Sequence, residues 1–334
     1  MSSDSITVLG AGSWGTALAI RLATNHNPTC LWGHEPAFMA TLQDDRENRQ
    51  YLPGHAFPDN LHIEAGLARA VGQSRDLLLV VPSHALREVL RQAAPAFTVS
   101  TRIAWATKGL ETGSGKFMSE VIEEELGNRY PTAVLSGPTF AKEVAAGLPT
   151  ALTVASNNPP FANDMAARLH GEVMRVYTSD DVIGVQLGGT VKNVLAIAAG
   201  ITDGLKLGAN SRAALITRGL AEIIRLGDAM GARRETLMGL AGVGDLILTC
   251  TDDQSRNRRL GLALGRGIPL EVAVKEIGQV VEGFNTAREV VQLARQYKVE
   301  MPISEQVYRL LYEDLPAADA VHNLLARGIK SETP

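Results

Sequence analysis

Lys192 is the residue whose setting in this sequence most directly indicates chemistry. It lies in residues 186–194, where apolar side chains recur at helical spacing. An ammonium group in such a segment needs a counter-charge, a polar partner or a bound substrate. On a helix, Gly189 and Gly188 would precede it by three and four positions, so that face of the preceding turn carries no side chains. The bare face leaves room for a ligand or for another backbone. The alternative is that Lys192 snorkels to water.

A glycine-rich turn near the N-terminus predicts a dinucleotide-binding site. Gly10, Gly12 and Gly15 form a G-x-G-x-x-G motif between a strand signal at residues 6–9 and a helical signal at residues 16–20. Gly10 permits a tight turn, Gly12 lets a pyrophosphate approach the backbone, and Gly15 lets the helix pack close to the strand. The helix N-terminus favours the negative charge. The alternative is a purely structural glycine turn.

The residues after the second strand signal, at 29–32, bear on the choice of cofactor. In NAD-selective folds an acidic residue here binds the ribose 2′-hydroxyl. In this chain His34 comes first and Glu35 follows, while Arg46 and Arg49 lie in the next loop and suit a 2′-phosphate. We therefore expect NADPH to be preferred, with NADH also usable. The alternative for His34 is a solvated loop histidine.

Polar residues follow two later strand signals of the first half. Open parallel sheets bind ligands outside the carboxyl ends of their strands. Residues 103–107 end in Lys108, which places an ammonium at the rim of the sheet near the expected nicotinamide. Residues 133–135 lead to Gly137 and Thr139, where backbone amides and a hydroxyl suit a small polar substrate. A simple proline turn is the alternative for this second segment.

Two segments of the second half suit an anionic substrate. Asp245 follows two glycines and precedes an apolar run, so it is either a helix N-cap or a site carboxylate. Ten residues later, Ser255, Arg256 and Asn257 bring an arginine fork beside a hydroxyl and an amide, which suits a phosphate monoester. The alternative is a solvated basic helix start. Taken together with Lys108 and Lys192, the two segments indicate an anionic substrate held between two domains. We interpret the bare face at Gly188 and Gly189 as the space in which this substrate meets the nicotinamide.

The composition excludes several classes of function. The 334 residues are 45% hydrophobic and 20% charged, with a formal net charge of −4, so we expect no general attraction to nucleic acid. Cys30 and Cys250 lie far apart, which argues against a disulfide framework or a zinc site and favours a cytoplasmic location. His, Cys and carboxylate residues do not cluster, so no metal site is predicted. Because the sequence contains no run of 18 apolar residues, we expect no membrane insertion.

The order of the patterns predicts two domains. Strand signals alternate with helical patterns at first, which is typical of an α/β Rossmann-type dinucleotide-binding domain with a mostly parallel sheet. From residue 182 the pattern is helical, with glycine-rich breaks near 200–208, 239–244 and 265–267. We place the domains at residues 1–180 and 181–330. The predicted strands cover residues 6–9, 29–32, 77–81, 103–107, 133–135, 151–155 and 174–177.

The sequence closely resembles the bacterial-type NAD(P)-dependent glycerol-3-phosphate dehydrogenases over nearly its whole length. The matching segments are GAGSWG at 10–15, YLPG at 51–54, WATKGLE at 105–111, SGPTFA at 136–141, VQLGGTVKNV at 185–194, GVGDLILTCT at 242–251, SRNRR at 255–259 and VVEG at 280–283. The resemblance implies a second domain of the all-α, 6-phosphogluconate dehydrogenase-like type and a subunit that is usually dimeric. It also implies reversible reduction of dihydroxyacetone phosphate to sn-glycerol 3-phosphate, which supplies glycerophospholipid synthesis.

The resemblance also implies roles for individual positions. Lys192 would be the proton donor and acceptor, with Lys108 beside the substrate oxygen and Asp245 as their carboxylate partner. The substrate pocket would comprise Lys108, Gly137, Thr139, Lys192, Asp245, Ser255, Arg256 and Asn257. The cofactor contacts would comprise Gly10, Gly12, Ser13, Trp14, Gly15, His34, Lys108, Ala141, Arg256, Val280 and Glu282. The family uses no metal.

Two other functions compete with this one. A 3-hydroxyacid dehydrogenase related to the 6-phosphogluconate enzymes would take a carboxylate substrate, whereas the segments 136–141 and 255–259 favour phosphate. A nicotinamide-sensing protein without turnover would not explain the presence of Lys108, Lys192 and Asp245 together. The sequence therefore favours a small phosphorylated ketone or alcohol as the partner of this chain.

Overall fold

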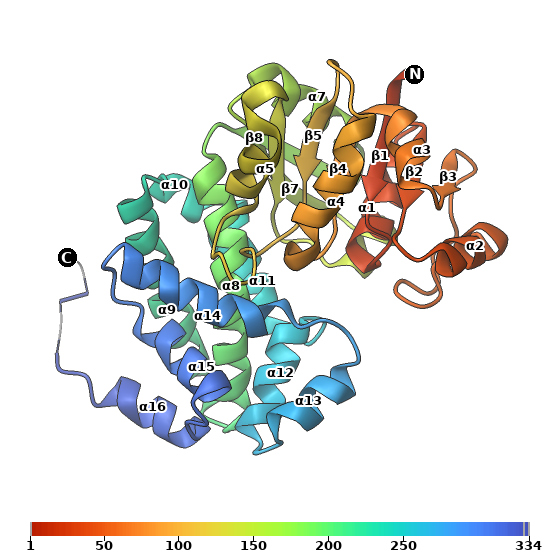
Figure 1. Cartoon of the computed structure of the whole chain (residues 1–334). Coiled ribbons are helices and arrows are strands. Elements are labelled where there is room, and N and C mark those ends of the chain that lie inside the picture. Colours follow the sequence, from red (N-terminus) through yellow and green to blue (C-terminus); the bar gives the residue numbers. More distant parts are fainter. Residues whose placement is uncertain (1, 330, 333–334) are drawn as a thin grey trace.

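The computed structural model describes residues 2–329 and 331–332 and places the first half of the chain around one sheet (Figure 1). Within these residues eight strands form the sheet in the order β3-β2-β1-β4-β5-β6-β7-β8. The strands are β1 (Ser2–Leu9), β2 (Thr29–Trp32), β3 (Leu61–Glu64), β4 (Ser74–Leu79), β5 (Arg102–Trp105), β6 (Thr132–Ser136), β7 (Thr150–Ala155) and β8 (Met174–Ser179).

The strand order creates a switch point at the carboxyl end of β1. β1 pairs in parallel with β2 on one side and with β4 on the other, so that Val8 lies between Leu31 and Leu78. The chain therefore leaves β1 where the order of strands reverses, which is the place where open α/β sheets bind ligands. Gly10 occupies this point with a φ of 129°, in the region that favours glycine.

Alternating residues of the strands build a core on each face of the sheet. Val8 and Leu78 belong to one hydrophobic cluster, whereas Leu9 and Leu79 belong to the other. The first face is covered by α1 (Ser13–Thr24), α2 (Pro36–Asp45), α6 (Ala141–Ala145) and α7 (Pro159–Leu169), and the second by α3 (Leu67–Gly72), α4 (Leu86–Ala93) and α5 (Met118–Leu126). The α/β class predicted from the sequence is thus confirmed.

One strand pairing reverses the direction of the chain before the helical half begins. β7 runs antiparallel to β6, and β8 runs parallel to β7. β8 therefore ends at the edge where the earlier strands begin, and α8 (Val182–Gly204) starts from that edge. Asp181 caps this helix by accepting a hydrogen bond from the Gly184 amide at 2.8 Å.

The second half of the described chain is helical and surrounds α8 (Figure 1). Besides α8 it contains α9 (Gly208–Met230), α10 (Arg234–Leu237), α11 (Asp245–Thr251), α12 (Arg256–Gly265), α13 (Leu270–Ile277), α14 (Glu282–Gln296), α15 (Pro302–Tyr312) and α16 (Ala317–Leu325). Of the described helices, α8 alone is long and apolar enough to cross a membrane, and 89% of its apolar window is buried inside the protein. That burial is typical of a core helix.

Glycines let α8 and α12 approach each other to backbone contact. A Cβ atom on Gly261 would lie 2.0 Å from the Ile197 carbonyl oxygen, and one on Gly200 would lie 2.1 Å from the Arg258 carbonyl oxygen. The prediction of a break near residues 200–208 was therefore wrong at its start, because α8 continues to Gly204. Gly200 serves close packing and does not end the helix.

Two of the differences from the predicted strands have a clear physical cause. β3 was not predicted, since Leu61–Glu64 is a short edge strand in which only Leu61 is fully buried. β4 begins three residues before the predicted start because Asp76, although charged, is fully buried. Arg102 from β5 donates two hydrogen bonds to its carboxylate, at 2.6 and 2.8 Å. Because a buried ion pair lies near the start of β4, its first residues lack the apolar pattern that predicts a strand.

We expect Gly261→Ala to lower the free energy of unfolding by about 1–3 kcal/mol, because the added methyl group would collide with backbone that cannot rotate away. Urea denaturation followed by circular dichroism measures the change. Gly72→Ala is the matched control: Gly72 lies in α3, and no atom of the described chain lies within 4 Å of its Cβ position, so helix propensity should leave the protein equally or slightly more stable. Equal midpoints for the two variants would contradict the packing argument.

Candidate active site

Asp245 joins two lysines that come from different halves of the chain. Its Oδ1 accepts a hydrogen bond from the Lys192 Nζ of α8 at 2.6 Å, and its Oδ2 accepts one from the Lys108 Nζ at 2.6 Å. Lys108 follows β5, so its side chain reaches across from the sheet. The Asp245 and Lys192 side chains are 1% and 9% exposed, so this is a buried cluster of two ammonium groups and one carboxylate.

Tight backbone packing fixes where Asp245 stands relative to Lys192. Residues Leu240–Gly244 form a π-helical turn that leads directly into α11, with Asp245 as its first residue. A Cβ atom on Gly188 would lie 2.3 Å from the Ala241 carbonyl oxygen of that turn. The bare face that the sequence placed before Lys192 is thus filled by backbone at Gly188, and the expectation of a substrate there was wrong.

Gly189 also faces protein. Its Cβ position is 2.7 Å from the Ser136 Oγ at the end of β6 and 3.8 Å from the Lys108 Cδ. A cavity beside Gly189, lined by Lys108, Ser136 and Thr190 among others, has a volume of about 10 Å³, which is room for roughly one water molecule. Such a space does not admit a three-carbon phosphate.

For Lys192 and for Asp245, burial shifts the pKa in one direction and the opposite charge of neighbouring groups shifts it in the other. Burial lowers the pKa of Lys192 to about 8, with the Asp245 carboxylate opposing this change and the Lys108 ammonium adding to it. Burial raises the pKa of Asp245, but the ammonium groups of Lys108 and Lys192 outweigh burial and hold that pKa below its ordinary value. Asp245 is therefore charged at neutral pH, while Lys192 exchanges its proton near working pH.

Two residues next to this cluster were missed by the sequence analysis. Thr249, one turn after Asp245, accepts a hydrogen bond from the Lys192 Nζ at 2.9 Å and donates one to the Asp245 carbonyl at 2.6 Å. Asn193 is 4% exposed, and its Nδ2 has no hydrogen-bond partner among the described residues. Both lie inside sequence segments already singled out. Only the spacing of Thr249, four residues after Asp245, signalled its place on the same helix face.

The segment at the start of α12 divides into separate roles. Ser255 is the N-cap of α12 and accepts a hydrogen bond from the Arg258 amide at 3.2 Å. The Asn257 Nδ2 donates to the Asn193 Oδ1 at 2.9 Å. The Arg256 guanidinium is partly exposed and donates a long hydrogen bond, 3.4 Å, to the Gln279 side chain. Arg258, in contrast, is buried and pairs with Asp203 at 2.6 Å, so it is a structural residue.

The loop after β6 lies beside Lys108. The Gly137 carbonyl accepts hydrogen bonds from the Lys108 Nζ at 3.3 Å and from the Thr139 hydroxyl at 3.1 Å. Gly137 itself has a φ of 156°, and a Cβ atom there would lie 2.8 Å from the Leu152 Cα. Ala141 begins α6 two residues after Thr139. The structure thus brings Gly137 and Thr139 to Lys108, as the strand-end argument predicts.

The glycine motif at the start of α1 has the shape of a dinucleotide cradle. A Cβ atom on Gly15 would lie 1.8 Å from the Gly10 carbonyl oxygen, whereas Gly12, the N-cap, has no atom of the described residues within 4 Å of its Cβ position. The backbone at Gly12 is therefore open to a large anion, with Ser13 as the first residue of the helix. The Trp14 Nε1 is buried and has no hydrogen-bond partner in the part of the chain that the structure describes. These residues fit a pyrophosphate.

The remaining predicted cofactor residues lie at the surface or near it. His34 is exposed just beyond β2, Val280 is 51% exposed, and Glu282 is the first residue of α14. The sequence suggested Arg46 as a partner of a 2′-phosphate, but its guanidinium donates instead to the carbonyls of Leu61 and Pro58 at 2.8 and 2.7 Å. Arg49 is 65% exposed.

The fold and the site define the class of this protein. It is a Rossmann-type nucleotide-binding protein with an all-helical second half and a lysine–aspartate–lysine cluster where the two halves meet. Two models of one protein family match the two halves of the chain. The model described as NAD-dependent glycerol-3-phosphate dehydrogenase N-terminus matches residues 5–162, and that of the C-terminus matches residues 181–322. The chain belongs to the NAD-dependent glycerol-3-phosphate dehydrogenase family.

Relatives and solved structures support this membership. The glycerol-3-phosphate dehydrogenase (NAD(P)+) of Shewanella sp. (strain MR-4) is 57% identical over 334 residues, covering 100% of this chain and 99% of that protein. The Pasteurella multocida (strain Pm70) protein of the same name is 57% identical, with 99% of both chains covered. The crystal structure of glycerol-3-phosphate dehydrogenase from Coxiella burnetii has a TM-score of 0.94 at 51% identity, over 97% of this chain and 99% of that one.

We expect Asp245→Asn to destabilise the fold by about 3–5 kcal/mol near pH 6, because it leaves buried ammonium groups unpaired. The folded-state pKa of Lys192 is already below its unfolded value and falls further without the carboxylate, so folding releases a proton in that range. The free energy of unfolding of the variant must then rise with pH. Its deficit relative to the wild type must shrink between pH 6 and 9.

Urea denaturation at both pH values measures this deficit. Asp228→Asn is the control, since Asp228 forms an exposed pair with Arg234 that is worth about 0–1 kcal/mol. A deficit for Asp245→Asn that does not change with pH would rule out Lys192 as the source.

Proposed function

We propose that this chain catalyses the reversible, NAD(P)H-dependent reduction of dihydroxyacetone phosphate to sn-glycerol 3-phosphate and so supplies glycerophospholipid synthesis. The observation that carries the proposal is the buried Lys192–Asp245–Lys108 cluster, which lies where the nucleotide-binding half meets the helical half. Membership of the family and 57% identity to proteins named for this activity support the same reaction.

Lys192 acts as the general acid of the reduction. When bound, the reduced nicotinamide supplies the hydride for the ketone carbon of the substrate. The Lys192 ammonium then gives a proton to the developing alkoxide, and the neutral amine takes that proton back in the reverse direction. A pKa of about 8 suits both directions near neutral pH, because acid and base forms are both populated.

Asp245 and Lys108 assist in different ways. Asp245 keeps Lys192 charged enough to donate a proton, and the Thr249 hydroxyl helps to fix the orientation of the Lys192 Nζ. Lys108 lies at the rim of the sheet and stabilises the negative charge that develops on the substrate oxygen. Gly137, Thr139, Ser255, Arg256 and Asn257 complete the proposed substrate pocket around these groups.

NADPH is proposed as the preferred cofactor, with NADH also accepted. Gly10, Gly12, Ser13, Trp14 and Gly15 would hold the pyrophosphate end. Exposed His34 and Arg49 support the preference, because His34 and not a carboxylate is the first side chain after β2, and because Arg49, although it pairs with Asp45 at 3.2 Å, is 65% exposed. A homodimer and a cytoplasmic location stay predictions from the sequence.

We expect Lys192→Ala to lower turnover by about 10²- to 10⁴-fold while cofactor affinity is kept. NADPH and NADH oxidation with dihydroxyacetone phosphate measures this by absorbance, and in the wild type NADPH should show the lower KM. The rate of reduction should fall as pH rises through about 8, as the Lys192 ammonium is lost, and the variant should lack this step. Lys275→Ala, an exposed lysine of α13, is the control. Near-normal turnover in Lys192→Ala would remove this residue from the chemistry.

Arg256→Ala should raise the KM for dihydroxyacetone phosphate by about 10- to 100-fold with a smaller effect on kcat, because the guanidinium grips the phosphate. Arg259→Ala, an exposed arginine of the same segment, should leave KM unchanged. Steady-state kinetics with phosphorylated and unphosphorylated dihydroxyacetone provide the measurement. Equal reduction of both ketones by the wild type would refute the phosphate grip.

A further inference from the structure

Residues 108–117, here called the Lys108 hairpin, leave the sheet and enter the helical half. Leu110 and Phe117 face each other in an antiparallel bridge, and the Glu111 amide donates to the Lys116 carbonyl at 2.9 Å. Leu110 and Phe117 are 2% and 4% exposed and pack in the hydrophobic cluster of the helical half, not in either cluster of the sheet. A segment that begins with a site lysine is thus embedded in the opposite half of the chain.

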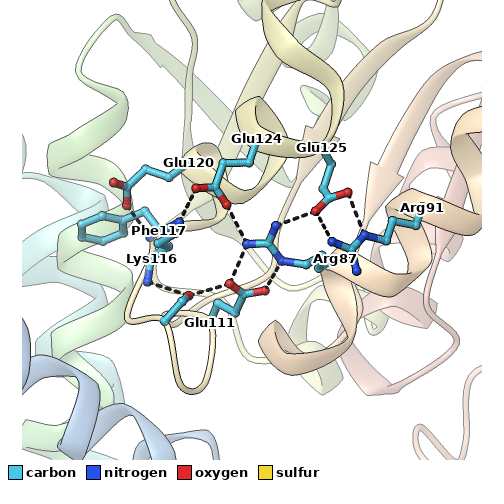
Figure 2. Close-up of polar contacts among 9 residues, drawn as sticks. Arg87, Arg91, Glu111, Lys116, Phe117, Glu120, Glu124 and Glu125 are labelled. Carbon is cyan, nitrogen blue, oxygen red and sulfur yellow. Dashed lines mark hydrogen bonds and ion pairs between the residues drawn. The ribbon is translucent and has the colours of Figure 1, made fainter.

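Arg87 of α4 anchors this hairpin to the nucleotide-binding half. Its Nε and Nη2 donate to the two carboxylate oxygens of Glu111 at 2.6 and 2.7 Å, a bidentate geometry. The same guanidinium reaches Glu124 and Glu125 of α5, so it lies at the centre of a set of carboxylates (Figure 2). The Arg87 guanidinium lowers the pKa of Glu111, and the pair is charged at neutral pH.

Glu289 of α14 holds the hairpin from the helical half. Its side chain is 1% exposed, and its Oε1 accepts a hydrogen bond from the Gly113 amide at 3.1 Å. Its Oε2 is buried with no hydrogen-bond partner among the described residues and lies 3.6 Å from the Cβ position of Gly115. The Arg288 Nε lies 3.6 Å from the Oε1. A buried carboxylate with so few partners lowers stability, so stability alone does not account for it.

The same helix also touches the start of the hairpin. Thr286 lies one turn before Glu289, and its Oγ1 is 3.5 Å from the Cβ position of Gly109, the residue after Lys108. At its N-terminus, α14 places the Gly283 amide 2.9 Å from the Oδ1 of Asn257. One face of α14 therefore contacts both the hairpin that carries Lys108 and a residue of the proposed substrate pocket.

We propose that Glu289 is a positioning residue, which fixes the Lys108 hairpin on α14 and thereby holds Lys108 at Asp245; this inference rests on the proposed function. The lysine side chain is long and flexible, so its ammonium is held in place only if its backbone is. Arg87 fixes that backbone relative to the sheet, and Glu289 fixes it relative to the helix bundle. With both anchors, Lys108 keeps its place between the two halves.

The test compares Glu289→Leu and Glu289→Gln in the full chain. Leucine fills the same space and removes both the acceptor and the buried charge, so the variant should fold with nearly unchanged stability. Its kcat with dihydroxyacetone phosphate should nevertheless fall about tenfold, since small misplacements of a site group are costly, while the KM for the cofactor stays the same. Glutamine keeps an oxygen for the Gly113 amide and should restore kcat to within about threefold of the wild type.

Combination with Lys108→Ala separates positioning from a general effect on structure. If Glu289 acts through Lys108, Glu289→Leu should add less than about a twofold loss in the Lys108→Ala background. A tenfold loss of kcat when Glu289→Leu is added to Lys108→Ala would overturn the proposal. A wild-type kcat in Glu289→Leu alone would also overturn it. Glu222→Gln replaces a second buried carboxyl group of the helical half, which accepts hydrogen bonds from the backbone of α15, and should change neither kcat nor the effect of Lys108→Ala.

Hydrogen exchange of residues 109–117, without substrate, provides the readout that does not depend on activity. Glu289→Leu should speed exchange in this segment about tenfold, and Glu222→Gln should not. Unchanged exchange in Glu289→Leu would overturn the anchor even if the reaction is as proposed. Absence of dihydroxyacetone phosphate reduction by the wild type would instead overturn the proposed function, whatever the exchange shows.

Discussion

Asp245 accepts hydrogen bonds from two ammonium groups that arrive from opposite halves of the chain, and the rest of the structure is arranged to make this possible. Two positive charges and one negative charge are buried together. Such a cluster persists only if each group is fixed and hydrogen-bonded, since an unpaired buried charge is far more costly than a paired one. Lys192 must therefore come from a rigid core helix, Asp245 from a helix start locked against it, and Lys108 from the rim of the sheet.

Glycine is the means by which these elements are locked. The π-helical turn before Asp245 lies against Gly188 of α8, and α12 lies against Gly200 of the same helix. At each place a side chain would force the backbones apart, and at Gly188 this would move the turn that leads to Asp245 away from Lys192. The glycines of the helical half thus determine the distance between α8 and its neighbours, whereas Gly10 of the nucleotide-binding half determines a turn.

Local sequence signals predicted the features that depend on local chemistry. The G-x-G-x-x-G turn, the strand end at Lys108 and the helix start at Asp245 were all recognisable, because each is defined by neighbours in the sequence. The family resemblance added the pairing of Lys192 with these groups. The buried start of β4 was missed because its charge is balanced by Arg102 from another strand. The contents of the face at Gly188 and the contact of Glu289 with Gly113 likewise involve residues more than 50 positions apart.

The reversed pairing of β7 gives the first turns of α8 the role of a spacer. Because β8 ends at the far edge of the sheet, the chain must climb back along the sheet before Lys192 reaches the strand ends that carry Lys108 and Ser136. Ten residues of helix rise about 15 Å, close to the length of about 16 Å for a five-residue strand such as β6. The first ten residues of α8 and the strand β6 are therefore nearly equal in length. Adding or deleting one residue in this stretch would turn Lys192 by about 100° away from its carboxylate, so the length of these three turns is fixed by the site.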